Sequence, residues 1–343
     1  MTRSVTLAVT RPAPPYSEGV KRFRRGALWA LLSGVVAFLV VPFLVPVSTT
    51  GTLTEREAAA PGAQFVEVGE LTVHVETAAY TGTAANPPVI VLLHGFGAST
   101  FSWREVVDPL AAFGDVVAYD RPAFGFTERP TEWQGENPYG VPGNLALLDA
   151  LLDRFADARD VILVGHSAGG LIAAEYARLH PDRVDALVLV APAVLTTGGA
   201  PAWLAPLLAV PQIDRLGPLL VQGIASSGDQ ILEQSFADSA VLTDAVRAGY
   251  RAPLTVIGWE AALWRFTAAP RDNALAENLD DLTVPTLLIT GDADTIVATA
   301  DTERLAALLS AAELVVIPRS GHLPHEERPD AFLTALADWF ARR

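Results

Sequence analysis

The stretch VILVGHSAGG, residues 161–170, joins a short apolar run to a glycine-rich turn. The apolar run predicts a buried strand, and residues 168–180 have the pattern of an amphipathic helix. The turn between them has the form Gly-x-Ser-x-Gly, which is typical of a tight elbow between a strand and a helix. Gly165 and Gly169 leave room where the strand and the helix approach closely, and the elbow exposes the hydroxyl of Ser167. Ser167 is therefore the first candidate functional residue.

Two further apolar runs end in side chains that could activate a serine hydroxyl. Residues 313–318 predict a strand, and His322 follows on a loop, where catalytic side chains often lie. Residues 284–290 predict another strand, which ends in Gly-Asp-Ala-Asp. Because a serine hydroxyl is a weak nucleophile, it needs a base and a group that orients the base. We expect Asp294 to orient His322, with Asp292 as the alternative.

A fourth segment, PVIVLLHGFG at residues 88–97, predicts a strand that ends in His-Gly-x-Gly. A turn of this kind can direct backbone N–H groups toward a developing oxyanion, and one such donor typically lowers the barrier by about 3–4 kcal/mol. We expect the N–H groups of Phe96 and Ala168 to be these donors. His166 and Trp103 are candidates to line a substrate pocket. His94 is expected to hold the turn by hydrogen bonding rather than to bind a metal, since no second ligand has suitable spacing.

Five segments, in this order, make residues 64–343 resemble the α/β-hydrolase superfamily, in the serine esterase-like branch that carries a cap. The order of serine, acid and histidine along the chain is also that of this superfamily. Serine at the elbow argues against the epoxide hydrolases and haloalkane dehalogenases, which carry aspartate there. One departure is Ala123, where the family often has glycine. The segments are HGFG (94–97), DRPAFG (120–125), GHSAGG (165–170), GDAD (291–294) and SGH (320–322).

The body alternates apolar runs with helix-like segments, which implies a mostly parallel sheet covered on both faces. We expect the α/β-hydrolase fold, with an eight-stranded sheet in a core of residues 64–195 and 280–343. The runs 65–68 and 71–76 predict an antiparallel hairpin at the sheet edge. The alternation breaks down over residues 196–279, where the resemblance implies a helical cap between the sixth and seventh strands. The other expected strands are 89–93, 116–119, 161–164, 186–190, 286–290 and 314–317, and the expected helices are 142–157, 168–180, 299–310 and 327–342.

Composition excludes several classes of chemistry and partner. The 343 residues contain no cysteine, which excludes disulfides, a thiol nucleophile and a sulfur-ligated metal. Residues 1–25 hold six Lys/Arg and one acid, so the other 318 residues carry 18 basic and 38 acidic side chains. A body this acidic repels nucleic acid, so we expect no nucleic-acid partner.

Residues 26–47 are uncharged and almost wholly apolar. At a rise of 1.5 Å per residue, such a helix crosses a hydrocarbon core of about 30 Å. We expect an uncleaved transmembrane signal anchor, with a basic cytoplasmic segment (1–25) before it and a tether (48–63) after it. The basic cluster then places the body outside the cell membrane. The alternative is a cleaved signal peptide and a secreted body, with Ala58-Ala59-Ala60 as a rather distant cleavage site.

The resemblance implies a serine hydrolase that needs no cofactor and no metal. The expected substrate is a small to medium carboxylic ester with an apolar acyl or alcohol part. A C–C bond hydrolase of diketone-type ring-cleavage products, or a cofactor-free perhydrolase, could use the same three residues. The alternative from another class is a membrane-tethered sensor or binding protein that keeps the fold without the chemistry.

Overall fold

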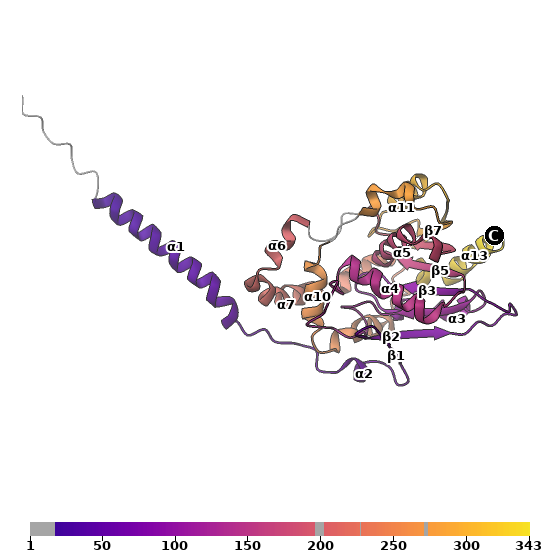
Figure 1. Ribbon diagram of the computed structural model, residues 1–343, viewed down its shortest axis with the longest axis horizontal. Coiled ribbons are helices and arrows are strands. Elements are labelled where there is room, and N and C mark those ends of the chain that lie inside the picture. The colour runs from indigo at the N-terminus through magenta and orange to yellow at the C-terminus, as the bar shows by residue number, and fades with distance from the viewer. Residues whose placement is uncertain (1–17, 196–201, 227, 271–273) are drawn as a thin grey trace, which may run out of the picture.

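The computed structural model describes residues 18–195, 202–226, 228–270 and 274–343. A long N-terminal helix, α1 (Glu18–Leu44), projects from an α/β body (Figure 1). Parts of the expected basic segment (1–17) and of the expected cap (196–201, 227 and 271–273) lie outside the described residues.

An eight-stranded sheet forms the centre of the body, in the order β1-β2-β4-β3-β5-β6-β7-β8. β2 runs antiparallel to both of its neighbours, β1 and β4, and all other neighbouring strands are parallel. This confirms the expected mostly parallel sheet and its antiparallel edge hairpin. The strands are β1 (Gln64–Val68), β2 (Leu71–Ala78), β3 (Val89–Leu93), β4 (Asp115–Tyr119), β5 (Val161–His166), β6 (Ala186–Val190), β7 (Thr286–Gly291) and β8 (Ala312–Ile317).

Helices cover both faces of the sheet, so its central strands are buried on two sides. Alternate residues of β3 illustrate this, because Val91 and Leu93 pack beneath α4, α5 and α11, whereas Ile90 and Leu92 pack beneath α3 and α13. A strand that is buried on both faces consists of consecutive apolar residues, which is why these strands were predictable from the sequence. The helices are α3 (Val107–Leu110), α4 (Val141–Phe155), α5 (Ala168–Leu179), α11 (Thr299–Leu308), α12 (Pro324–Glu327) and α13 (Pro329–Phe340).

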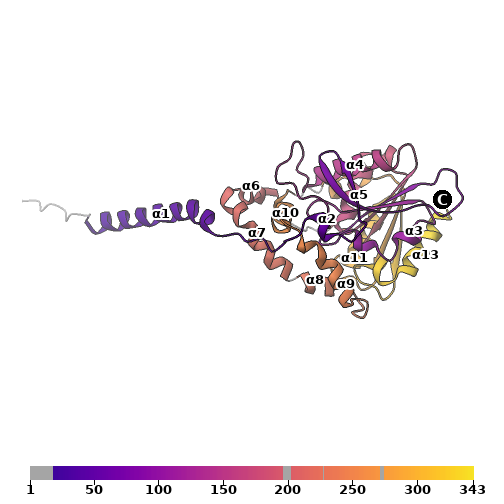
Figure 2. The same ribbon diagram turned by 90° about the horizontal axis from the view of Figure 1, so that it is seen from below.

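A helical cap lies between β6 and β7 (Figures 1 and 2). Its core includes Trp259 and Trp264, which cluster with Phe124 from the loop after β4. The helix pair α7 and α10 packs closely, since a Cβ at Gly217 would lie 2.0 Å from the ring of Trp264. The cap helices are α6 (Ala205–Leu208), α7 (Pro211–Ser226), α8 (Gly228–Ser235), α9 (Asp244–Arg251) and α10 (Trp259–Ala268), with the 3₁₀ helices η3 (Ala202–Leu204), η4 (Ala252–Thr255), η5 (Ala274–Glu277) and η6 (Leu279–Asp281).

The described part of the N-terminal region begins with α1. α1 begins before the expected anchor, continues through Pro42 and ends at Leu44, because Pro46 disfavours the helical conformation at the residue before it. Residues 48–58, called the strap below, contain the short helix α2 (Glu55–Ala58) and lie along the cap. Leu53 forms a parallel bridge with Val256, and their neighbours exchange backbone hydrogen bonds of 2.8–3.0 Å. This part of the expected tether is therefore docked on the cap.

Candidate active site

Ser167 lies at the sharp turn between β5 and α5. Its backbone has φ 51° and ψ −117°, a strained conformation for a residue with a side chain. A Cβ at Gly165 would lie 2.6 Å from the Cα of Gly170, and one at Gly169 would lie 2.2 Å from the carbonyl oxygen of Leu93. The two glycines of the motif are thus required by close approach of backbone, and the turn presents the Ser167 hydroxyl to a cavity.

His322 and Asp294 meet at the same edge of the sheet. The imidazole Nδ1–H of His322 donates to Asp294 Oδ2 at 2.8 Å, and both side chains are buried. The other carboxylate oxygen of Asp294 accepts the N–H groups of Ile296 and Val297 at 2.9 and 3.0 Å. These bonds fix the carboxylate, which in turn fixes the ring of His322 with Nδ1 protonated. Asp292, the alternative, is exposed and accepts only a long bond of 3.4 Å from the N–H of Ser320.

The loop that carries His322 is held by the cap and by a second histidine. The N–H of His322 donates to the carbonyl of Ser235 at the end of α8, at 2.8 Å. The Nε2–H of His166 donates to the carbonyl of His322 at 2.9 Å, and the two rings lie 4.7 Å apart. Burial is the largest cause that lowers the pKa of His166 well below its usual range. His166 is therefore a neutral support beneath His322, and it also lines the cavity as expected.

The His-Gly-x-Gly turn after β3 is fixed by its own first residue. Nδ1–H of His94 donates to the carbonyl of Gly95 at 2.8 Å, and Nε2 accepts the N–H of Arg121 at 3.0 Å. Burial, with a smaller effect of the Arg121 charge, lowers the pKa of His94 to about 3. Phe96 follows in this turn, and Ala168 is the first residue of α5, whose leading N–H groups have no intrahelical acceptor. Both candidate donors thus belong to segments at the mouth of the elbow.

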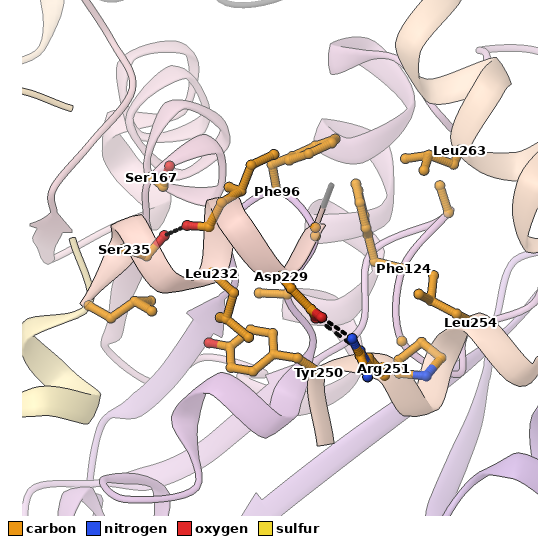
Figure 3. Close-up of a pocket in the computed structure, with 18 of the residues that line it drawn as sticks. Phe96, Phe124, Ser167, Asp229, Leu232, Ser235, Tyr250, Arg251, Leu254 and Leu263 are labelled. Atoms are coloured by element: carbon orange, nitrogen blue, oxygen red, sulfur yellow. Dashed lines mark hydrogen bonds and ion pairs between the residues drawn. The ribbon is translucent and has the colours of Figure 1, made fainter. Parts of the chain in front are cut away.

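A cavity of about 210 Å³ lies between the cap and this edge of the sheet. Most of its lining is apolar, and Figure 3 shows Ser167 and Phe96 on one side and Leu254 and Leu263 on the other. Ser167, His322 and His166 are among its polar lining residues. A site of this kind suits an uncharged, largely apolar ligand.

Two guanidinium groups, from Arg129 after β4 and Arg251 in the cap, also line the cavity, and neither belongs to a recognisable sequence motif. Arg251 pairs with Asp229, its Nε 2.9 Å from Oδ1 (Figure 3). Arg129 is buried, donates to the carbonyl of Gly125 at 2.7 Å and lies 3.9 Å from the carboxylate of Glu55 in the strap. Arg251 therefore has a close anionic partner, whereas Nε and Nη1 of Arg129 make no hydrogen bond within the described residues.

The prediction that Trp103 lines the pocket is wrong. Trp103 ends the 3₁₀ helix η1 (Thr100–Trp103), is fully buried in the core under α3 and α13, and stacks on His325 with ring centroids 4.4 Å apart. Its position shortly after the turn suggested the cavity, but η1 turns the chain back under the sheet.

A buried polar network adjoins this tryptophan. Ser102 accepts from Nε2–H of His325 at 2.9 Å and donates to Glu326 at 2.9 Å. Arg104 and Tyr250 donate to the same carboxylate. Tyr250 belongs to α9 and lines the cavity, so the network ties the cap to the chain just after His322. The sequence signal was the charged run directly after His322, at residues 325–328.

Comparisons with known proteins agree with this architecture. A family model described as the alpha/beta hydrolase family matches residues 90–335. The 2-hydroxy-6-oxo-2,4-heptadienoate hydrolase of Pseudomonas putida is 28% identical over 289 residues, which cover 80% of this chain and 97% of the relative. A solved esterase from Thermogutta terrifontis has a TM-score of 0.62 at 21% identity and covers 82% of this chain and 99% of its own. A solved membrane phospholipase A has a TM-score of 0.60 at 22% identity and covers 94% and 98%.

The mostly parallel eight-stranded sheet and the helical cap between β6 and β7 agree with the fold expected from the sequence. The family match spans more than half of the chain and includes the elbow. The chain belongs to the alpha/beta hydrolase family.

Proposed function

We propose that this family member is a serine hydrolase that cleaves carboxylic esters of small to medium size. The observation that carries the proposal is the 2.8 Å hydrogen bond between His322 and Asp294 beside a cavity that also exposes Ser167. A serine at a strained elbow, a histidine of fixed tautomer and a fixed carboxylate are the parts that acyl transfer requires.

In the proposed reaction, Nε2 of His322 takes the proton of Ser167 as its oxygen attacks the ester carbonyl. Asp294 keeps the proton of Nδ1 in place and stabilises the imidazolium. The N–H groups of Phe96 and Ala168 bind the oxyanion. His322 then gives the proton to the leaving alkoxide, which departs as the alcohol and leaves an acyl-enzyme. Water repeats the sequence, releases the acid and restores Ser167.

The apolar lining favours an ester whose acyl or alcohol part is hydrocarbon. Phe124, Leu254 and Leu263 line the cavity away from Ser167. Burying about 100 Å² of hydrocarbon there contributes roughly 2.5 kcal/mol to binding. The solved esterase named above has a similar fold, which is consistent with this chemistry on this scaffold.

A C–C bond hydrolase is the second candidate, because a curated relative with that kind of name matches over nearly its whole length. The substrate in that name is a carboxylate, and a buried carboxylate needs a cationic partner. Arg251 is paired with Asp229, whereas Nε and Nη1 of the buried Arg129 make no hydrogen bond within the described residues and could meet this need. The ester remains the first proposal because most of the cavity lining is apolar.

We also propose that α1 anchors the protein in the membrane, with the basic side in the cytoplasm and the body outside. α1 is long and apolar enough to cross a bilayer: its most apolar 18-residue stretch has a mean hydropathy of 2.4, and only 6% of that stretch is buried in the body. The structural match to the membrane phospholipase A covers 94% of the chain, which is more than residues 64–343 make up. The match therefore extends into this N-terminal region.

Hydrolysis of p-nitrophenyl esters of increasing acyl length by the full chain in detergent tests the ester proposal. We expect turnover by the wild type and a loss of at least about 10³-fold in kcat for Ser167→Ala and His322→Gln. Ser235→Ala is the matched control. Its hydroxyl lines the same cavity but donates to the carbonyl of Ile231 at 2.8 Å, so its loss should change kcat little.

Undiminished turnover by Ser167→Ala contradicts the proposed mechanism. Cleavage of a vinylogous diketone acid, without turnover of any ester, moves the assignment to the C–C hydrolase. Retained folding with neither activity leaves a binding role for the cavity and contradicts both enzyme assignments.

A further inference from the structure

Large apolar side chains are exposed on the part of the cap formed by η3, α6 and α7. Trp203 is 78% exposed, Leu220 61% and Leu207 50%. These three side chains define the apolar face. Large apolar side chains that are exposed together in one region of a protein are typical of an interaction site.

The charge of this region differs from that of the body. Residues 202–226 contain only one acid and one base, Asp214 and Arg215. Asp214 accepts from the indole of Trp264 at 2.9 Å, so it is turned toward the cap core. The apolar face is therefore nearly neutral in a body whose net charge is strongly negative. An acidic surface is repelled by anionic lipid, whereas a neutral apolar one is not.

The apolar face lies directly beside the end of α1. Arg215 of α7 donates to the carbonyl of Val45 at 3.5 Å, and Gln222 of α7 donates to the carbonyl of Ser48 at 3.0 Å. Figures 1 and 2 both show α6 and α7 at the end of the body that faces α1. The four residues from Leu44 to Ser48 can span at most about 14 Å.

The strap prevents the body from swinging away from this position. The N–H and the hydroxyl of Thr50 donate to Glu260 of α10 at 2.5 and 2.9 Å, and the indole of Trp259 donates to the Thr50 hydroxyl at 2.9 Å. Leu53 pairs with Val256. If α1 crosses a bilayer, α7 must therefore lie at its surface.

We propose that the apolar face docks on the lipid bilayer beside α1, with Trp203, Leu207 and Leu220 in the interface. Tryptophan prefers the region between hydrocarbon and headgroups, and leucine adds buried apolar area. This docking rests on the proposed membrane anchor, and it orients the cap, one helix away from the cavity, toward the lipid. Gly217 of α7 packs on Trp264 of α10, and Leu263 of α10 lines the cavity.

The absence of cysteine makes a direct test practical, because each introduced thiol is the only one in the chain. Single variants Leu207→Cys and Leu220→Cys of the full chain carry an environment-sensitive fluorophore and are reconstituted into phosphatidylcholine–phosphatidylglycerol vesicles. Some of the lipids bear a nitroxide quencher on the acyl chain. Leu179→Cys is the matched control, since Leu179 is a leucine exposed to 46% at the C-terminal end of α5, opposite the elbow. Trp29→Cys reports on α1 itself.

We expect quenching at positions 207 and 220 to exceed that at 179 by at least about twofold and to approach that at 29. Quenching at 29 with none above the control at 207 and 220 overturns the docking and keeps the anchor. Lack of quenching at 29 overturns the anchor and the docking with it. Disulfide formation between copies through Leu207→Cys, in place of lipid quenching, assigns the apolar face to a second copy of the chain and also overturns the proposal. Esterase activity is not a readout here, so these results are separate from the test of the proposed chemistry.

Discussion

Asp292 and Asp294 follow the same strand, yet their surroundings are opposite. Asp294 is buried and accepts three hydrogen bonds, one of them from His322. Asp292 is exposed at the start of the loop. The chain turns directly after β7, so the two side chains point in different directions, and spacing alone could not say which direction leads to His322. The choice depended on the loop that carries the histidine, which comes from a different strand.

Replacement of each acid by its amide tests this difference. Asparagine at 294 retains the size of the side chain but replaces an acceptor with a donor and removes the charge that stabilises the imidazolium. We therefore expect Asp294→Asn to lower kcat by about 10³–10⁴-fold on the ester identified above. Asp292→Asn should leave kcat within about twofold, since its side chain contacts only one distant N–H group. Equal losses in the two variants would contradict the assignment of Asp294.

At the level of elements, the strap links the N-terminal region to the wall of the cavity. Thr50 binds Glu260 and Trp259, and Trp259 lines the cavity. Gly51 permits this close approach, because a Cβ there would lie 2.0 Å from the carbonyl oxygen of Val256. Cleavage at Ala58-Ala59-Ala60, the alternative considered from the sequence, would remove the strap together with these contacts.

Thr50→Val should therefore destabilise the body and loosen the cavity wall. Valine keeps the shape of threonine but leaves the indole N–H of Trp259 without its acceptor, a loss of about 1–3 kcal/mol. We expect the midpoint of thermal unfolding to fall by several degrees and KM to rise more than kcat changes. Thr52→Val is the control, because the side chain of Thr52 is exposed and its N–H still reaches the carbonyl of Thr255. An equal shift in both variants would show that the strap adds no stability through Thr50.

Strands, helices and connecting segments differ in how well the sequence predicts them. The buried strands and the elbow were predictable because parallel strands covered on both faces are apolar throughout and the close contacts at 165 and 169 demand glycine. The strap was not, since its polar, threonine-rich composition is that of a linker and its partners lie some 200 residues away. Trp103 was misplaced for a similar reason, because a turn of η1 decides which side of the sheet it faces.

At the scale of the whole molecule, several histidines are buried in the neutral form. His325 joins His94 and His166, and burial is the largest cause of the lowered pKa in all three. His74 differs: burial disfavours its charge, but the hydrogen bond and charge of Asp120 outweigh this and raise its pKa. His74 therefore adds stability that is present below pH 6.5 and is lost as the pH rises through its folded value. The three neutral histidines have the opposite effect, because they lower the stability of the folded state as the pH falls.

The body should consequently lose stability on mild acidification. Between the folded and unfolded pKa values of a neutral buried histidine, the unfolded chain binds more protons, so stability falls as the pH drops below about 6.5. With a folded pKa of about 3, His94 alone lowers the free energy of unfolding by about 2 kcal/mol between pH 7 and pH 5. Urea unfolding at a series of pH values measures this slope.

His325→Gln should make that slope shallower, because glutamine can still donate to Ser102 but does not titrate. His180→Gln, at an exposed position, is the control substitution. If His325→Gln has the same slope as the wild type, burial does not keep His325 neutral in the folded state. The support that neutral His166 gives to the His322 loop would then have to be reconsidered, since a charged ring there would repel the imidazolium that forms in the proposed reaction.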